Sequence, residues 1–189
     1  MNLGRYFCIA GGPSLNNEDL GLLAEFDGKI IVVNNSWERY GNADIIFAGD
    51  YQWWSMYHSR AMTSQAELWT CDLKAAKEFS LHYFDGVGSF NSGLRAIELA
   101  VSLGANTVFL LGYDCSLKHG FHWHGPHQSG LQNPTENSIC GWKKQFHRLS
   151  RMIKRTNIIN CSSYTELDIG IQMSLHDAIK SCGSNSDME

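Results

Sequence analysis

Four histidines fall within a run of nine residues, HGFHWHGPH, which extends from His119 to His127. Imidazole accepts a proton near neutral pH, because its unperturbed pKa is about 6.5, and it also binds transition metals. Two kinds of chemistry therefore fit this run. One histidine acts as a general base, or several act together as metal ligands. A third interpretation is a surface loop whose histidines share no role.

The spacing of His122, His124 and His127 is similar to the metal-binding H-x-H-x-D-H run of metallo-β-lactamase-like hydrolases. Pro126 stands where that run has its aspartate, and the other ligands of that family are not evident at their fixed distances. We therefore expect a loop that supplies one catalytic histidine rather than a metal centre. The three candidates for this histidine are His122, His124 and His127.

A second chemical signal lies at the start of the chain, where an apolar strand runs into a glycine turn in the sequence CIAGGPSL of residues 8–15. Such a turn leaves backbone N–H groups and the positive end of a helix open to an anion, most often a nucleotide phosphate. We expect Gly11, Gly12 and Ser14 to contribute to this site. Ser14 is also expected to cap the following helix.

Polar residues follow the other predicted strands as well, and the carboxyl ends of parallel strands meet at the edge of the sheet where ligands bind. Each of these residues also has a structural interpretation, as a turn residue or a helix cap. Their convergence on one edge favours a ligand site. The further candidate contacts to a nucleotide are Asn34, Asn35, Asp50, Asn91, Ser92, Gly93 and Asp114.

Apolar runs of strand length alternate with segments of helical period, which predicts an α/β fold: a Rossmann-like, doubly wound and mostly parallel sheet with helices on both faces. The predicted strands are 6–10, 30–34, 44–48, 67–71, 107–112 and 157–161. The predicted helices are 17–26, 51–60, 92–103, 139–155 and 173–181. The segment 117–138 fits neither period, and Trp123 and Trp142 favour an ordered loop there.

Composition limits the class of protein. A chain of 189 residues with 43% hydrophobic content predicts a single domain over 1–182, which the motifs above lead us to expect to bind a nucleotide, followed by a disordered tail over 183–189. The net charge of -4 argues against a nucleic-acid partner. Six scattered cysteines, the absence of a signal peptide and the absence of a membrane-spanning run predict free thiols and a cytoplasmic protein.

The order of these motifs, from the Gly-Pro-Ser turn through Asn91-Ser92-Gly93 and Gly112-Tyr113-Asp114 to the histidine run, resembles a known superfamily. It is that of bacterial lipooligosaccharide sialyltransferases, flagellar accessory proteins and archaeal 6-hydroxymethylpterin diphosphokinases. Short phage-encoded proteins share the His-Trp-His-Gly loop and the later Asn-Pro-Thr, here at 133–135. The resemblance extends from about Tyr6 to about Leu167.

This resemblance implies roles for particular residues. In the sialyltransferases the Gly-Pro-Ser turn and the Ser-Gly helix start bind a cytidine nucleotide, which implies contacts from Gly11, Gly12, Ser14, Ser92 and Gly93. Asn34 or Asn35 matches an asparagine that faces the same ligand. A loop histidine of the family is the general base, and His122, His124 and His127 occupy the equivalent segment.

Three departures from the sialyltransferases leave alternatives open. The first turn lacks the family's asparagine, the segment 115–121 is shorter than the family's lid, and Asp50 replaces an asparagine. A carboxylate beside a phosphate favours a bridging Mg²⁺. We therefore expect a glycosyltransferase-like enzyme that uses a CMP-sugar, with two alternatives: a diphosphokinase holding Mg²⁺ on Asp50 and Asp114, or a non-catalytic nucleotide-binding phage protein. Trp53, Trp54 and Trp123 are candidates for stacking on the ligand. Core packing is the alternative role; it is expected for Trp142 and is also open for Trp54.

Overall fold

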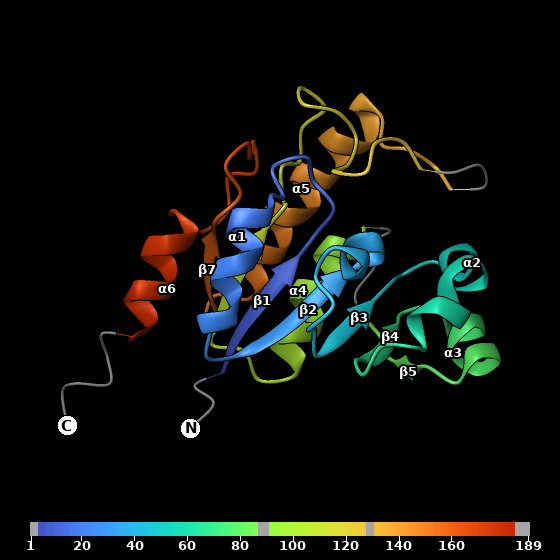
Figure 1. Cartoon of the computed structure of the whole chain (residues 1–189). Coiled ribbons are helices and arrows are strands. Elements are labelled where there is room, and N and C mark those ends of the chain that lie inside the picture. The colour runs from blue at the N-terminus through green and yellow to red at the C-terminus, as the bar shows by residue number, and fades with distance from the viewer. Residues whose placement is uncertain (1–3, 87–90, 128–130, 184–189) are drawn as a thin grey trace.

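The computed structural model describes residues 4–86, 91–127 and 131–183 of the chain. Within these residues eight strands form one sheet in which every neighbouring pair is parallel (Figure 1). The strands are β1 (Arg5–Ile9), β2 (Lys29–Val33), β3 (Ile45–Phe47), β4 (Glu67–Thr70), β5 (His82–Tyr83), β6 (Thr107–Leu111), β7 (Asn157–Asn160) and β8 (Ile171–Gln172). The predicted parallel sheet is confirmed. The predicted tail from 184 onward lies outside the described residues.

The strand order is β5-β4-β3-β2-β1-β6-β7-β8. The chain moves outward from β1 to β5 and then returns to place β6 on the other side of β1. This reversal opens a crevice beyond the carboxyl ends of β1 and β6, which is where ligands bind in open α/β sheets.

Helices cover both faces of the sheet, as predicted. In the described part of the chain the α-helices are α1 (Asn17–Leu22), α2 (Tyr51–Ala61), α3 (Leu73–Phe79), α4 (Ser92–Ser102), α5 (Glu136–Met152) and α6 (Leu175–Gly183). Two short 3-10 helices are η1 (Leu23–Glu25) and η2 (Asn34–Glu38).

Alternate residues of each strand enter two separate cores. In β1, Tyr6 and Cys8 pack with α4 and α5, whereas Phe7 and Ile9 pack with α1, α2 and α6. Both faces of the central strands are therefore buried, which explains why these strands read as continuous apolar runs. The result is a three-layer α/β arrangement that is not closed into a barrel.

Several elements differ from the predictions. Helix α5 begins at Glu136 because Thr135 and Ser138 form a capping box, and it ends at Met152. The two-residue edge strands β5 and β8, the helix α3 and the turn η2 have no counterpart among the predicted elements. The edge strands are too short and too exposed to show a hydrophobic pattern.

Two further expectations concern cysteines and membranes. All six cysteines lie in the described part of the chain, and all are free. Among the described helices, none combines the length and the apolar character that crossing a bilayer requires.

Candidate functional site

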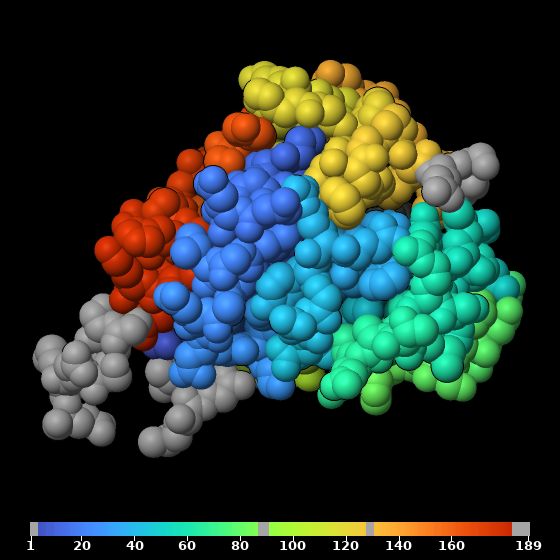
Figure 2. All heavy atoms as spheres, in the orientation of Figure 1, coloured from blue at the N-terminus to red at the C-terminus, as the bar shows by residue number. Residues whose placement is uncertain are grey.

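A cavity of about 680 Å³ lies at the carboxyl edge of the sheet. Its walls come from the turn after β1, the turn η2, the start of α4, the end of β6, the first turns of α5 and the segment 119–127, which we call the His loop. Figure 2 shows the His loop (yellow) over the surface formed by the β1 turn and η2 (blue). Every predicted site residue except Ser14 lines this cavity.

Two glycines allow β1 and β6 to approach each other at the floor of the cavity. The Gly12 N–H donates to the Gly112 carbonyl at 2.9 Å. A Cβ at Gly12 would lie 2.5 Å from that carbonyl oxygen and 2.7 Å from the Asp114 carboxylate. Gly112 itself has a φ of +71°, a conformation that favours glycine. Gly12 is therefore required by close packing, whatever it contributes to a ligand.

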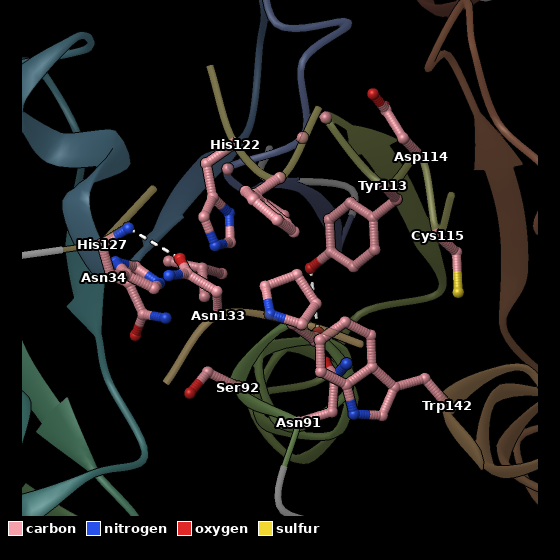
Figure 3. Close-up of a pocket in the computed structure, with 18 of the residues that line it drawn as sticks. Asn34, Asn91, Ser92, Tyr113, Asp114, Cys115, His122, His127, Asn133 and Trp142 are labelled. Carbon is pink, nitrogen blue, oxygen red and sulfur yellow. Dashed lines mark hydrogen bonds between the residues drawn. The ribbon is translucent and has the colours of Figure 1, made fainter. Parts of the chain in front are cut away.

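Ser14 does not face the cavity because Asp114 binds it. The Ser14 backbone N–H donates to Asp114 Oδ2 at 2.8 Å, and the Ser14 hydroxyl donates to Asp114 Oδ1. The Asp114 carboxylate points away from the middle of the cavity (Figure 3). The expectation that Ser14 caps α1 is wrong, since Asn16 is the N-cap and accepts from the Asp19 N–H.

The start of α4 lines the cavity with Asn91, Ser92 and Gly93. Asn91, and not Ser92, is the N-cap, and it accepts from the Leu94 N–H at 2.9 Å. The Ser92 hydroxyl instead accepts from the Gly49 N–H at 3.1 Å, and the Gly93 carbonyl accepts from the Tyr113 hydroxyl at 2.9 Å. The first N–H groups of an α-helix have no intrahelical acceptor and carry a partial positive charge. Those of α4 therefore favour an anion.

The two asparagines at the start of the 3-10 helix η2 have different surroundings. Asn35 is buried, and its side-chain oxygen accepts from Trp53 Nε1 at 2.8 Å, so this residue is structural. Asn34 has a left-handed φ of +49° and lines the cavity, and its Oδ1 is buried without a hydrogen-bond partner in the described structure. Trp53 and Trp54 are 1% and 0% exposed, so the expectation that they stack on a ligand is wrong.

The three candidate histidines form one cluster. The ring of His122 lies 5.1 Å from that of His124 and 4.2 Å from that of His127, centroid to centroid. Burial, reinforced by these two neighbours, lowers the pKa of His122 from its ordinary value to about 3. Burial also lowers the pKa values of His124 and His127. At His124 the negative charge of Glu38 acts in the opposite direction and raises the pKa. The cluster is therefore uncharged at neutral pH.

The orientation of His122 leaves one nitrogen for a ligand. Its ring lies beside Gly11, where a Cβ would stand 3.4 Å from His122 Nδ1, and the neighbouring Trp123 N–H donates to the Gly11 carbonyl at 2.9 Å. Within the described residues His122 Nε2 is buried and has no partner. In Figure 3 the ring points toward the middle of the cavity. A buried polar atom without a partner costs free energy. A ligand group that forms a hydrogen bond with this nitrogen would therefore stabilise the protein.

Other lining residues were not predicted to contact a ligand, or were given another role. Ser36 is 0% exposed, and its hydroxyl has no partner among the described residues. Trp123 Nε1 is also buried without a partner there. Trp142 is half-buried and lines the cavity rather than lying wholly in the core. Asn133 accepts from the His127 N–H at 2.7 Å and so closes the far end of the His loop. Ser36 carries no local pattern that predicts a site, whereas Asn133 belongs to the Asn-Pro-Thr motif, which was not assigned a role.

The charges around the cavity are few. Among the described residues that line it, none is Lys or Arg, and Asp50 and Asp114 are the acidic ones. Partial burial, followed by the charge of Asp72, raises the pKa of Asp50. A Mg²⁺ shared by Asp50 and Asp114 is disfavoured by this arrangement, because two hydrogen bonds from Ser14 hold the Asp114 carboxylate and it points away from the middle of the cavity (Figure 3). In the described part of the chain no three His, Cys, Asp or Glu side chains are arranged to hold a metal ion.

No protein-family model and no curated protein matches the chain. Its structure is similar to that of the MAf glycosyltransferase from Magnetospirillum magneticum AMB-1, with a TM-score of 0.68 and 14% sequence identity, over 96% of this chain and 36% of that one. A thiamine pyrophosphokinase from Bacillus subtilis matches with a TM-score of 0.44 and 12% identity, over 84% of this chain and 61% of that one. The chain thus spans about a third of the length of the glycosyltransferase, and the similarity shows a shared fold.

Proposed function

We propose that the cavity binds a nucleotide sugar and that the protein is a glycosyltransferase-like enzyme with a His-loop general base. The observation that carries the proposal is the set of unpartnered polar atoms around one cavity. Asn34 Oδ1, Ser36 Oγ and His122 Nε2 belong to residues that line the same space as the N-terminus of α4. They offer hydrogen bonds to a polar ligand whose anionic group lies at the helix start.

The charges favour a ligand with one phosphate. A helix N-terminus supplies roughly half a positive charge. No described lining residue adds a lysine or an arginine, and Asp50 contributes a negative charge. A sugar linked to a nucleoside monophosphate carries one phosphate charge, whereas ATP or a diphosphate sugar needs additional cations. The CMP-sugar type therefore fits better than the ATP of a diphosphokinase.

His122 is the histidine best placed to act as the base. Its Nε2 is buried without a partner among the described residues, and its ring points toward the middle of the cavity (Figure 3). In the proposed step Nε2 takes the proton of an acceptor hydroxyl, whose oxygen bonds to the sugar carbon as the bond from that carbon to the phosphate oxygen breaks. The α4 N–H groups stabilise the charge on the departing phosphate. A bound phosphate also raises the pKa of His122 toward the range in which a base is effective.

Ligand binding is tested by thermal denaturation with CMP, UMP and ATP, each with and without Mg²⁺. A ligand that binds only the native state raises Tm as its concentration exceeds Kd. We expect CMP or UMP to stabilise the protein without Mg²⁺. Stabilisation by ATP only with Mg²⁺ favours the diphosphokinase alternative, and no response to any nucleotide contradicts the proposal.

Catalysis is tested by replacing His122, His124 and His127 by alanine one at a time, and by measuring transfer from whichever CMP- or UMP-sugar the nucleotide screen supports. A general base contributes about 10²- to 10⁴-fold to the rate. We expect a loss of that size for His122→Ala with nucleotide affinity largely retained. If all three variants keep full activity, the base assignment is wrong. If CMP binds but no sugar is transferred, the non-catalytic alternative applies.

A further inference from the structure

Arg39 connects three separate segments beside the cavity. It follows η2 in the chain and donates through Nη1 to the Leu15 carbonyl at 2.5 Å. Its Nε and Nη2 donate to Asn17 Oδ1 at 3.3 and 3.2 Å. The guanidinium is thereby fixed against the turn between β1 and α1. Its central carbon lies 4.9 Å from the ring centroid of Trp123 in the His loop.

Trp123 stands between His122 and His124 in the chain, so its position determines where both imidazoles lie. Its indole ring packs against the core that contains α1 and α2, and Arg39 lies over the ring. Its backbone N–H donates to Gly11. A guanidinium over an indole contributes about 0.5–1 kcal/mol at an exposed site and more where water is excluded.

The start of this segment is held independently of Arg39. Glu166 accepts from the Ser116 hydroxyl at 3.0 Å and from the Lys118 ammonium at 2.8 Å, and the His119 ring stacks on Tyr164 at 4.3 Å. Loss of the Arg39 contact therefore leaves residues 116–119 in place. The part released is the stretch that carries Trp123 and the histidine cluster.

We propose that Arg39 is a positioning residue, which acts through Trp123 to hold His122 over the cavity with its Nε2 directed inward. The effect of Arg39 on catalysis rests on the proposed function, whereas its effect on the position of the His loop does not. Arg39 does not line the cavity, so a direct contact with the ligand is not part of its role. A lysine at this position keeps the positive charge but loses the planar fork that holds Leu15 and Asn17 together.

The test is an NMR measurement on the ligand-free protein with the wild type, Arg39→Ala and Arg39→Lys. The His122 signals are assigned by comparison with His122→Gln. At about pH 5.5 the wild-type His122 imidazole is uncharged, because its pKa is about 3. Once the loop opens, its pKa rises toward about 6.5 and most of the imidazole is protonated at that pH. We expect this change in Arg39→Ala and a smaller one in Arg39→Lys.

A matched control exists in Arg60, which lies over the Trp37 ring at 5.3 Å and pairs with Glu38 at 2.9 Å. This second arginine–tryptophan pair contains no residue of the His loop. Arg60→Ala is expected to leave His122 uncharged. In Arg39→Ala the Trp123 amide should also exchange its hydrogen about five- to tenfold faster. If His122 stays uncharged in Arg39→Ala and Trp123 exchange is unchanged, Arg39 does not position the loop. Because no nucleotide is present, this result is independent of whether the cavity binds one.

Discussion

Acid should destabilise the protein through His122, in an amount that follows from its burial. The folded-state pKa of His122 is lowered to about 3, while the unfolded-state value is about 6.5. The unfolded chain therefore binds more protons between these values, so stability is lost as the pH falls through the unfolded pKa. From about pH 7.5 to about pH 5.5, the linkage relation gives a loss of about 1.4 kcal/mol from this residue. Any folded-state pKa below about 4.5 gives nearly the same figure.

The assay is urea unfolding of the wild type, His122→Gln and His147→Gln at the two pH values. His147 is an exposed histidine of α5, so its variant controls for the loss of an imidazole as such. We expect the wild type and His147→Gln to lose about 1.4 kcal/mol more than His122→Gln between about pH 7.5 and 5.5. His124 and His127 act in the same direction and contribute in all three proteins. Equal losses in all three proteins would refute the conclusion that His122 is held buried and uncharged.

Four substitutions at the floor of the cavity and at α4 have separate expected outcomes. Asp114→Asn disrupts the two hydrogen bonds from Ser14 and should lower the urea-unfolding free energy by about 2 kcal/mol or more. Unchanged stability would mean that these bonds do not hold Asp114 in place, and that its carboxylate is available to a metal. Gly12→Ala places a methyl group 2.5 Å from the Gly112 carbonyl and should cost about 3 kcal/mol, whereas Gly11→Ala meets only His122 Nδ1 at 3.4 Å and should cost much less. Asn91→Ala removes the α4 cap and should lower stability by about 1 kcal/mol, measured in the same way, and should weaken CMP binding; full retention of both contradicts the assignment of the cap.

The parallel sheet and its ligand edge were predictable because their causes are local. A strand buried on both faces reads as an apolar run, and the residue that follows it lies at the carboxyl edge in any doubly wound sheet. Asn34, Asp50 and Asp114, which follow predicted strands, could therefore be assigned to one edge without coordinates, whereas the resemblance gave the place of His122. The strands β5 and β8 could not be found, since two exposed residues carry no period.

The fine structure of the site depends on contacts that are distant in sequence. The local sequence predicts Ser14 as a phosphate ligand, but in the structure its N–H and its hydroxyl donate to Asp114, which lies 100 residues later in the chain. The local sequence allows Trp53 to stack on a ligand, but in the structure its ring is buried in the core and its Nε1 donates to the Asn35 side chain. Whether a polar side chain faces a ligand or the protein is decided by tertiary packing, and no short motif records that choice.

The central claim is that a nucleotide phosphate lies at the N-terminus of α4 and not at the glycine turn after β1. Titration of the ¹⁵N-labelled protein with CMP, followed through backbone amide chemical shifts, tests it directly. The account predicts the largest shifts at Ser92 and Gly93, with changes at Asn34 and little change at Ser14, whose amide is bound to Asp114. Shifts centred on Gly12 and Ser14, or no shifts at saturating CMP, would contradict it.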